Sequence, residues 1–171
     1  ARNLGFEQRP ASDDVLMVGI EGPVDDIKVH IHPVEVKIGE NSSTVLNKAH
    51  EQVTNTYASL RKALWPDEGK DRLECRLSRN FLMQLILVSC EKMKLYNIYP
   101  NENWDMVIKD FREQLLNEQY SFSEELNSFI GKGTIISFRT DCLNIEGSIE
   151  NEISLLEFPE KMGSWYSQPM K

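Results

Sequence analysis

The chain has 171 residues, of which 40% are hydrophobic and 27% are charged, and its formal net charge is −8. This length suits one domain with a substantial core, and the composition is that of an ordinary globular protein. The acidic balance argues against general binding of nucleic acids, which requires a basic surface, and against attraction to anionic membranes.

The three cysteines, Cys75, Cys90 and Cys142, lie far apart in the sequence and include no Cys-x-x-Cys pair. This odd and scattered set predicts neither a disulfide framework nor a structural zinc site. We therefore expect a reducing compartment, the cytoplasm or the nucleus. Residues 1–12 hold no apolar run of the signal-peptide kind, and the longest apolar cluster, 81–90, is too short to span a bilayer.

The N-terminal part of the chain is predicted to form two strands. Residues 1–13 are polar and predict a flexible segment, and the continuous apolar run 15–20 is typical of a buried strand. Gly22-Pro23 marks a turn. Alternating apolar and polar residues over 27–38 predict a second strand, in which Pro33 indicates an edge, a bulge or a kink because it lacks a backbone donor.

Two long helices are predicted next. The first should begin near residues 41–43, which are good N-cap types, and end at Trp65-Pro66, since proline cannot continue a helix. The second should cover 71–97. Its centre, 81–90, is apolar nearly all round, so we expect this helix to be buried on most sides.

A third long helix is predicted over 101–119, with its large apolar residues on one face. A short fourth helix should follow, because Ser121 and Glu124 have the spacing of a capping box, and it should stop at Gly131. Three strands, 134–139, 142–149 and 153–158, are then separated by turn residues. Residues 160–171 predict an irregular tail.

These elements predict an α+β fold. We expect one domain over 14–159, in which an antiparallel sheet of about five strands, two N-terminal and three C-terminal, packs against three long helices and one short helix. The two extended ends of the chain would then meet across a helical middle.

The strongest candidate for a metal site is the pair His30 and His32. A spacing of two residues in a strand places both imidazoles on one face. A third ligand would come from His50 or from an acid such as Asp25, Asp26 or Glu35. The more ordinary interpretation is a polar strand face that happens to hold two histidines, and we expect no bound metal.

No other catalytic or cofactor motif is present. The chain has no Gly-x-Ser-x-Gly sequence, and Cys90 lies in the most apolar predicted helix, where a thiol has low reactivity. The segment Gly131-Lys132-Gly133-Thr134 lacks the spacing of a phosphate-binding loop and leads into a strand, so it is interpreted as a helix stop. We therefore expect neither an enzyme nor a cofactor.

Six residues are candidates for binding a protein partner. Basic side chains with helical spacing gather where the second helix begins, although cations are disfavoured at a helix N-terminus, and a solvated face is the alternative interpretation. Large aromatic side chains outside the helical stripes are typical of binding hot spots, although they could equally cover the protein's own sheet. The candidates are Arg72, Arg76, Arg79, Trp65, Trp165 and Tyr166.

The favoured hypothesis is a non-catalytic protein–protein interaction protein, acting as a subunit, adaptor or assembly factor in a homo- or hetero-oligomer. The apolar surplus of the second helix offers surface for another chain, and an exposed edge strand could be extended by a partner's strand. Three alternatives remain: a small-molecule or lipid binder with a pocket between sheet and helices, a metal-dependent enzyme using His30 and His32, and nucleic-acid binding through the arginines. The pocket would be lined by residues such as Leu82, Ile86, Phe111 and Phe138.

Overall fold

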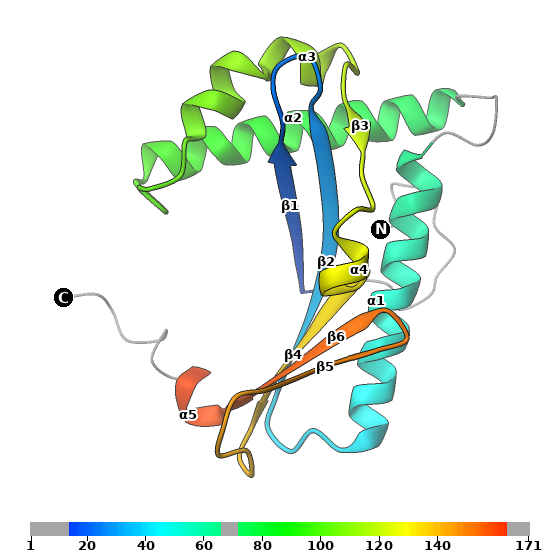
Figure 1. Ribbon diagram of the computed structural model, residues 1–171, viewed down its shortest axis with the longest axis vertical. Coiled ribbons are helices and arrows are strands. Elements are labelled where there is room, and N and C mark those ends of the chain that lie inside the picture. The colour runs from blue at the N-terminus through cyan, green and yellow to red at the C-terminus, as the bar shows by residue number, and fades with distance from the viewer. Residues whose placement is uncertain (1–13, 66–71, 164–171) are drawn as a thin grey trace. The chain divides into compact units, whose positions relative to one another are not determined.

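The computed structural model describes residues 14–65 and 72–163 (Figure 1). These residues form six strands and six helices, one of which, η2, is a single π-helical turn. In chain order the elements are β1 Val15–Glu21, β2 Lys28–Ile38, α1 Ser43–Leu64, α2 Leu73–Leu95, η2 Met106–Asp110, α3 Arg112–Leu116, β3 Ser121–Phe122, α4 Asn127–Ile130, β4 Gly133–Arg139, β5 Glu146–Glu150, β6 Ile153–Pro159 and α5 Glu160–Gly163.

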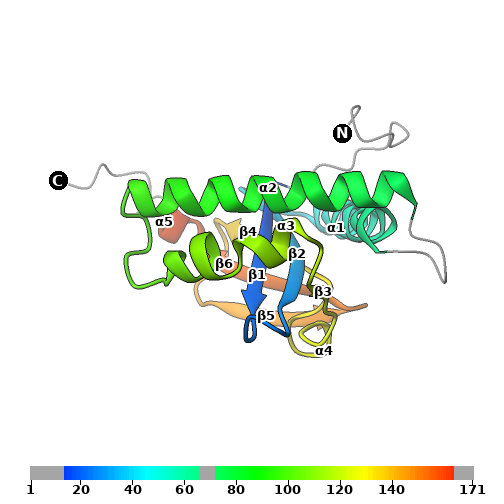
Figure 2. The same cartoon turned by 90° about the horizontal axis from the view of Figure 1, so that it is seen from above.

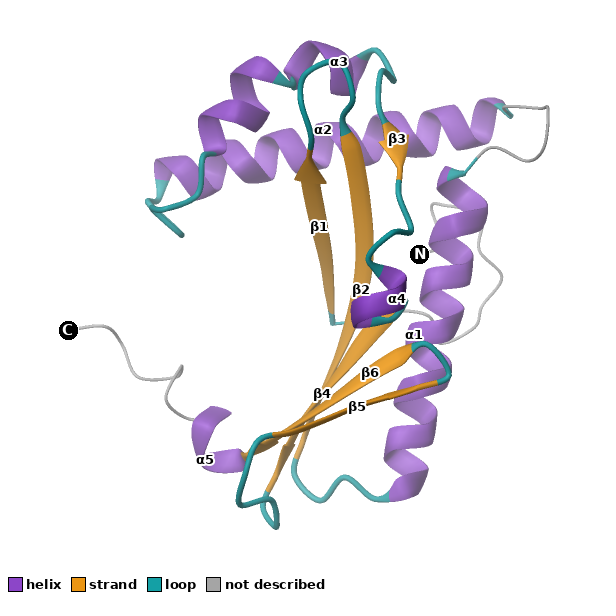
Figure 3. Ribbon diagram, viewed as in Figure 1, coloured by secondary structure: helices purple, strands orange, loops and turns teal. Residues whose placement is uncertain are grey.

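The α+β class is confirmed, but the sheet is mixed and not antiparallel. The strand order is β1-β2-β4-β6-β5, and β3 pairs with β2 (Figure 3). Strand β2 is parallel to both β3 and β4, and β4 is parallel to β6, whereas β5 and β6 are antiparallel. The prediction of about five antiparallel strands with four helices was therefore wrong in the direction of the strands, in the number of strands and in the number of helices.

Two features of the chain path explain the parallel pairs. The segment between β2 and β4 is long enough for a crossover, which parallel pairing requires. Strands β5 and β6 form a tight hairpin in which Glu150 pairs with Ile153, and the loop residues Asn151 and Glu152 both have positive φ, as a type I′ turn requires. Strand β6 lies between β4 and β5, and it runs parallel to β4 and antiparallel to β5.

The chain divides by its contacts into two compact units. Unit 1 comprises the described residues within Ala1–Met17, Ile31–Ser59 and Glu124–Lys171, and unit 2 those within Val18–His30 and Leu60–Ser123. Strands β1 and β2 and helix α1 each contribute residues to both units. The prediction of a single domain over 14–159 stays a prediction.

The core of unit 1 lies between α1 and the strands β4 and β6. Ala49 and Val53 of α1 are buried against Ile135 and Ile153, and partly buried leucines surround this cluster. Gly133 permits the close approach of α1 to β4, since a Cβ atom built on it would lie 2.2 Å from Cγ1 of Val53. The apolar stripe of the predicted first helix therefore covers the sheet within unit 1.

Helix α1 begins as predicted, but Asn41 has another role. The helix starts at Ser43, while the buried amide of Asn41 donates a hydrogen bond to Oγ of Ser137 on β4, at 2.8 Å. Asn41 thus ties the loop before α1 to the sheet and satisfies a buried hydroxyl. At the other end, α1 stops at Leu64, just before Pro66 in the sequence.

Unit 2 contains α2, and η2 and α3 lie along one side of it (Figure 2). The predicted continuous helix over 101–119 was wrong. The amide of Phe111 donates to the carbonyl of Met106, five residues earlier, which makes a π-helical turn before α3. Val107, Phe111 and Leu115 are nevertheless buried. The apolar spacing therefore identified the packed residues, but not the helix type.

The predicted capping box was also wrong. Ser121 belongs to β3, and α4 begins later, at Asn127, with no side-chain cap. The Glu124 carboxylate instead accepts a hydrogen bond from the Tyr57 hydroxyl, at 3.0 Å. This tertiary partner on α1 replaces the local capping interaction that the spacing suggested. Helix α4 ends at Ile130 with Gly131 as its C-cap, which confirms the predicted stop, and β4 begins at Gly133, one residue before its predicted start.

Strand β2 is an interior strand, so the edge position suggested for Pro33 was wrong. Pro33 is fully buried and immediately precedes Val34, the first residue of β2 that pairs with β4. Charged and polar residues of the strand are buried too, including His30 and Glu35. The alternation of apolar and polar residues in β2 therefore does not correspond to one buried and one solvent-exposed face of the strand.

Candidate protein interaction surface

Helix α2 has two opposite apolar faces. One of them is buried in the molecule and packs on the side of η2 and α3. Its seven buried residues recur at intervals of three or four, as one side of an α-helix requires. They are Cys75, Arg79, Leu82, Met83, Ile86, Leu87 and Cys90.

The other face of α2 is apolar and exposed. Its side chains also recur every three or four residues in most of the helix, and each is between 45% and 76% exposed. They are Leu73, Leu77, Phe81, Leu85, Val88 and Leu95, and we call them the α2 stripe. Figure 2 shows η2 and α3 along one side of α2. The exposure of the six side chains shows that the described elements of unit 2 leave the stripe uncovered.

The expectation that α2 is buried on most sides was therefore wrong. The apolar residues that surround the helix in the sequence divide into a buried set and an exposed set. Met83 and its neighbours fill the core of unit 2, whereas Phe81 and Leu85 face outward. Single exposed apolar side chains are common, but six on one helix face form a contiguous patch of the kind that marks interaction surfaces.

Arg79, one of the predicted partner-binding residues, is engaged inside unit 2. Its guanidinium is buried and donates to the Glu118 carboxylate, with Nη2 2.6 Å from Oε2, and to the carbonyl of Leu64 at 3.2 Å. Glu118 has a positive φ of 57° just after α3, and this turn brings its carboxylate to α2. The arrangement joins the N-terminal half of α2 to the C-terminal ends of α1 and α3 and satisfies a buried charge.

The other predicted partner-binding residues are placed differently. Arg72 and Arg76 are exposed at the start of α2, and Nε of Arg76 lies 3.4 Å from Oε1 of Glu118. Trp65 is half-buried and stacks on Phe122, with ring centroids 4.4 Å apart. Trp165 and Tyr166 lie outside the described residues. That these residues bind a partner stays a prediction, and the burial of Arg79 leaves Arg72 and Arg76 as the accessible arginines of that set.

The two histidines of β2 have separate partners. Nε2 of His30 lies 2.8 Å from Oε1 of Glu21, and Nε2 of His32 lies 2.7 Å from Oγ1 of Thr134. Burial lowers the pKa of His32 below its ordinary value, which keeps this imidazole neutral near pH 7. His50 contacts the backbone carbonyl of Glu150. In the described part of the chain, no three His, Cys, Asp or Glu side chains come together as metal ligands would.

The cysteines are all free thiols in environments that do not activate them. Cys75 and Cys90 are buried on α2, and burial is the main cause that raises the pKa of Cys90. Cys142 is half-buried in the loop before β5, with its thiol 2.7 Å from the carbonyl of Asn144. Within residues 14–65 and 72–163, the thiols of Cys75 and Cys142 contact backbone carbonyls and not histidines, so the geometry there offers no base for a thiolate nucleophile.

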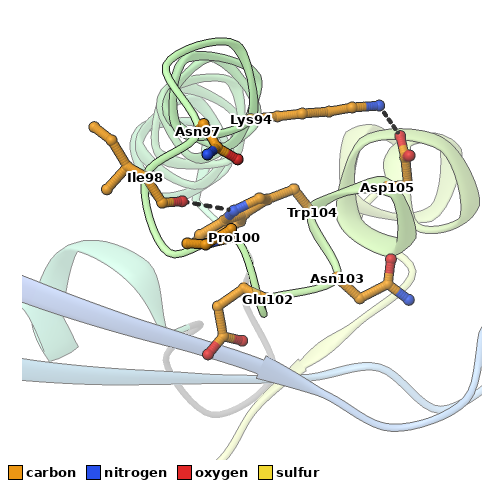
Figure 4. A pocket seen from close by; sticks show the side chains of 8 residues that line it. All are labelled: Lys94, Asn97, Ile98, Pro100, Glu102, Asn103, Trp104 and Asp105. Carbon is orange, nitrogen blue, oxygen red and sulfur yellow. Dashed lines mark hydrogen bonds and ion pairs between the residues drawn. The ribbon is translucent and has the colours of Figure 1, made fainter.

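A small hollow of about 180 Å³ lies where α2 leads into the turn before η2 (Figure 4). Trp104 forms one wall and donates its indole N–H to the Ile98 carbonyl at 3.1 Å. Lys94 and Lys109 both contact Asp105, and the hydrogen bond from Lys94 is the main cause that lowers the pKa of this carboxyl. The hollow is below the usual 300–1,000 Å³ of ligand pockets, and two of its charged groups, Lys94 and Asp105, already pair with one another.

Comparisons of the chain with models of protein families, with curated proteins and with solved structures find no match. Among the helices of the described residues, none is long and apolar enough to cross a membrane.

Proposed function

We propose that this chain is a non-catalytic protein–protein interaction protein, a subunit or adaptor of a complex, and that the α2 stripe is its main contact surface. The observation that carries the proposal is the exposure of six large apolar side chains on one face of a long helix. Burial of such side chains against a partner is favourable by about 25 cal/mol for each Å² removed from water.

The geometry of α2 also supports this function. The buried face of α2 fixes the helix through Met83, Leu87 and neighbouring residues, and the Arg79–Glu118 ion pair fixes its N-terminal half. The stripe is therefore presented by a helix that is already in place, so a partner binds it without paying the entropy of folding a segment. A preorganised apolar helix face is one of the standard forms of protein recognition.

A small-molecule or lipid binder is the second function considered. Leu82, Ile86 and Phe111, which were predicted to line its pocket, are buried core residues of unit 2, and Phe138 of unit 1 packs on Phe158 with ring centroids 5.5 Å apart. These side chains are engaged with their own neighbours, which favours the interaction role over the ligand-binding role. The separate partners of His30 and His32 likewise weigh against the metal-dependent enzyme.

The proposal is tested by affinity purification of the tagged chain from its own cells with a paired variant. Phe81→Ser and Leu85→Ser together interrupt the middle of the stripe, and we expect at least about a tenfold loss of the captured partner, because central apolar anchors dominate interfaces. Leu143→Ser is the matched control, since Leu143 is 88% exposed but lies in the loop before β5. Equal capture by wild type, stripe variant and control, with unchanged thermal melting, would contradict the proposal.

A further inference from the structure

The charges that border the α2 stripe form a regular pattern. Glu74 and Lys92 are exposed at opposite ends of α2, about 18 residues or five helical turns apart, so they lie on the same side of the helix. Neither side chain forms an ion pair with another described residue of the chain. On the side of the stripe that holds these two residues, the exposed charge is acidic at the start of α2 and basic at its end, whereas Glu91, near the end of the other side, pairs with Arg112 of α3.

The apolar residues of the stripe have the same symmetry. Phe81 and Leu85 lie at equal distances from position 83, and Glu74 and Lys92 have the same midpoint. Leu77 and Val88 are symmetric about a point half a residue away. Reversing the direction of the helix therefore places apolar residues over apolar residues and exchanges the acidic end with the basic end.

We propose, resting on the function proposed above, that the partner of the α2 stripe is a second copy of this chain, whose α2 packs antiparallel to the first across a two-fold axis that crosses the stripe midway between Phe81 and Leu85. In this pair Phe81 contacts Leu85 of the second copy, and Leu77 contacts Val88. Glu74 faces Lys92 of the second copy, and the two-fold axis repeats each contact, as an isologous interface requires.

The charges favour the antiparallel arrangement over a parallel one. In a parallel two-fold pair every residue faces its own copy, so Glu74 would face Glu74 and Lys92 would face Lys92, and like charges destabilise an interface. Antiparallel packing also places the negative end of one helix dipole beside the positive end of the other. Gln84, which is exposed in the stripe close to the axis, carries an amide that can both donate to and accept from its own copy.

The length of α2 sets the expected strength. A helix of 23 residues is about 34 Å long, and a pair of helices of this length gives an interface near the lower end of the stable range, about 1,200 Å² in total. We expect reversible dimerisation with a dissociation constant on the order of micromolar.

Sedimentation velocity of the purified full chain over a wide concentration range tests the pairing. We expect the wild type to dimerise and Phe81→Ser to weaken the dimer at least about tenfold. Glu74→Lys alone and Lys92→Glu alone should each weaken it about three- to tenfold, and the double swap Glu74→Lys with Lys92→Glu should restore it, because the complementary pairs are rebuilt. Leu143→Ser is the control. A double swap that is weaker than both single variants would overturn the antiparallel pairing.

Disulfide trapping in a Cys142→Ser background tests the direction of the helices. In the antiparallel pair, Gln84→Cys lies beside its own copy, whereas two Leu77→Cys residues are about 18 Å apart along the axis, at about 1.5 Å per residue. We therefore expect a covalent dimer from Gln84→Cys and none from Leu77→Cys. Trapping of both variants would indicate parallel helices and overturn the proposal.

The outcomes separate this inference from the proposed function. A wild type that stays monomeric at every concentration, while the stripe variant loses a different captured protein, overturns the second copy as partner and supports the interaction role. A monomer whose stripe variant captures the same proteins as the wild type overturns both. A dimer that is insensitive to Phe81→Ser places the dimer contact elsewhere and overturns the second copy as the partner of the stripe, while the capture experiment still decides the proposed function.

Discussion

Helices α1 and α2 are almost equal in length, yet they use their apolar residues in different ways. In α1, Ala49, Val53 and Tyr57 are buried along one side, and the side chains between them are mainly polar. In α2, apolar residues occupy two opposite faces, of which one is buried and one is exposed. The first pattern is explained by the fold of the chain alone, whereas the second carries an apolar face that its own unit does not use.

The difference between the two faces of α2 gives the largest expected effect. Met83 is fully buried and Leu77 is 62% exposed on the same helix. Met83→Ala should lower the free energy of unfolding by about 2–5 kcal/mol, because it leaves a cavity in a packed core. Leu77→Ala should change it by no more than about 0.5 kcal/mol.

Denaturation with guanidinium chloride at low protein concentration, where a dimer is dissociated, measures both variants. Equal losses for Met83→Ala and Leu77→Ala would mean that the stripe is part of the core, and the contrast between α1 and α2 would disappear.

The packed side of α1 gives an intermediate effect. A methyl group at Gly133 would meet Cγ1 of Val53 at 2.2 Å and the carbonyl of Pro33 at 2.9 Å. Gly133→Ala should therefore destabilise the protein by about 1–3 kcal/mol, as overpacking of a core does.

A double-mutant cycle identifies the cause of this loss. Val53→Ala removes the closest atom, so it should recover part of the destabilisation when combined with Gly133→Ala. Gly147→Ala is the control, because its nearest neighbour would be the flexible end of Leu156 at 3.3 Å. Strictly additive effects of Gly133→Ala and Val53→Ala would show that α1 does not approach β4 as described.

The smallest expected effect concerns His32, a partly buried polar residue of β2. Burial lowers the pKa of His32, so the unfolded chain takes up a proton near the ordinary value of 6.5 while the folded chain does not. The stability that His32 contributes is present above pH 6.5 and is lost as the pH falls from there through the lowered pKa of the folded state.

His32→Gln removes this titration but keeps a side chain that can hydrogen-bond to Thr134. Urea denaturation between pH 5 and pH 8 should therefore give a shallower pH dependence for the variant than for the wild type. Identical pH profiles would mean that His32 titrates alike in the folded and unfolded chains.

The sequence by itself determined where the two long helices and most of the strands lie, although it missed β3 and α5 and the break in the helix over 101–119. The bounds of α1 and α2 agree with the predicted ranges to within about two residues, and the three C-terminal strands and the hairpin turn lie close to their predicted positions. Hydrophobic periodicity, prolines and glycines act over a few residues, so they can be read locally. The absence of a recognisable catalytic motif was likewise a property of the sequence alone.

Only the tertiary structure decided how these segments use their side chains. The direction of β4 and β6 depends on which strands pair in the sheet. The π-helical turn before α3 arises where Phe111 packs. Arg79 is buried because Glu118, 39 residues away, provides its counter-charge. The sequence of α2 showed that apolar residues lie on all sides of this helix. Which face remains exposed is decided by its contacts with η2 and α3, and no local sequence pattern encodes those contacts.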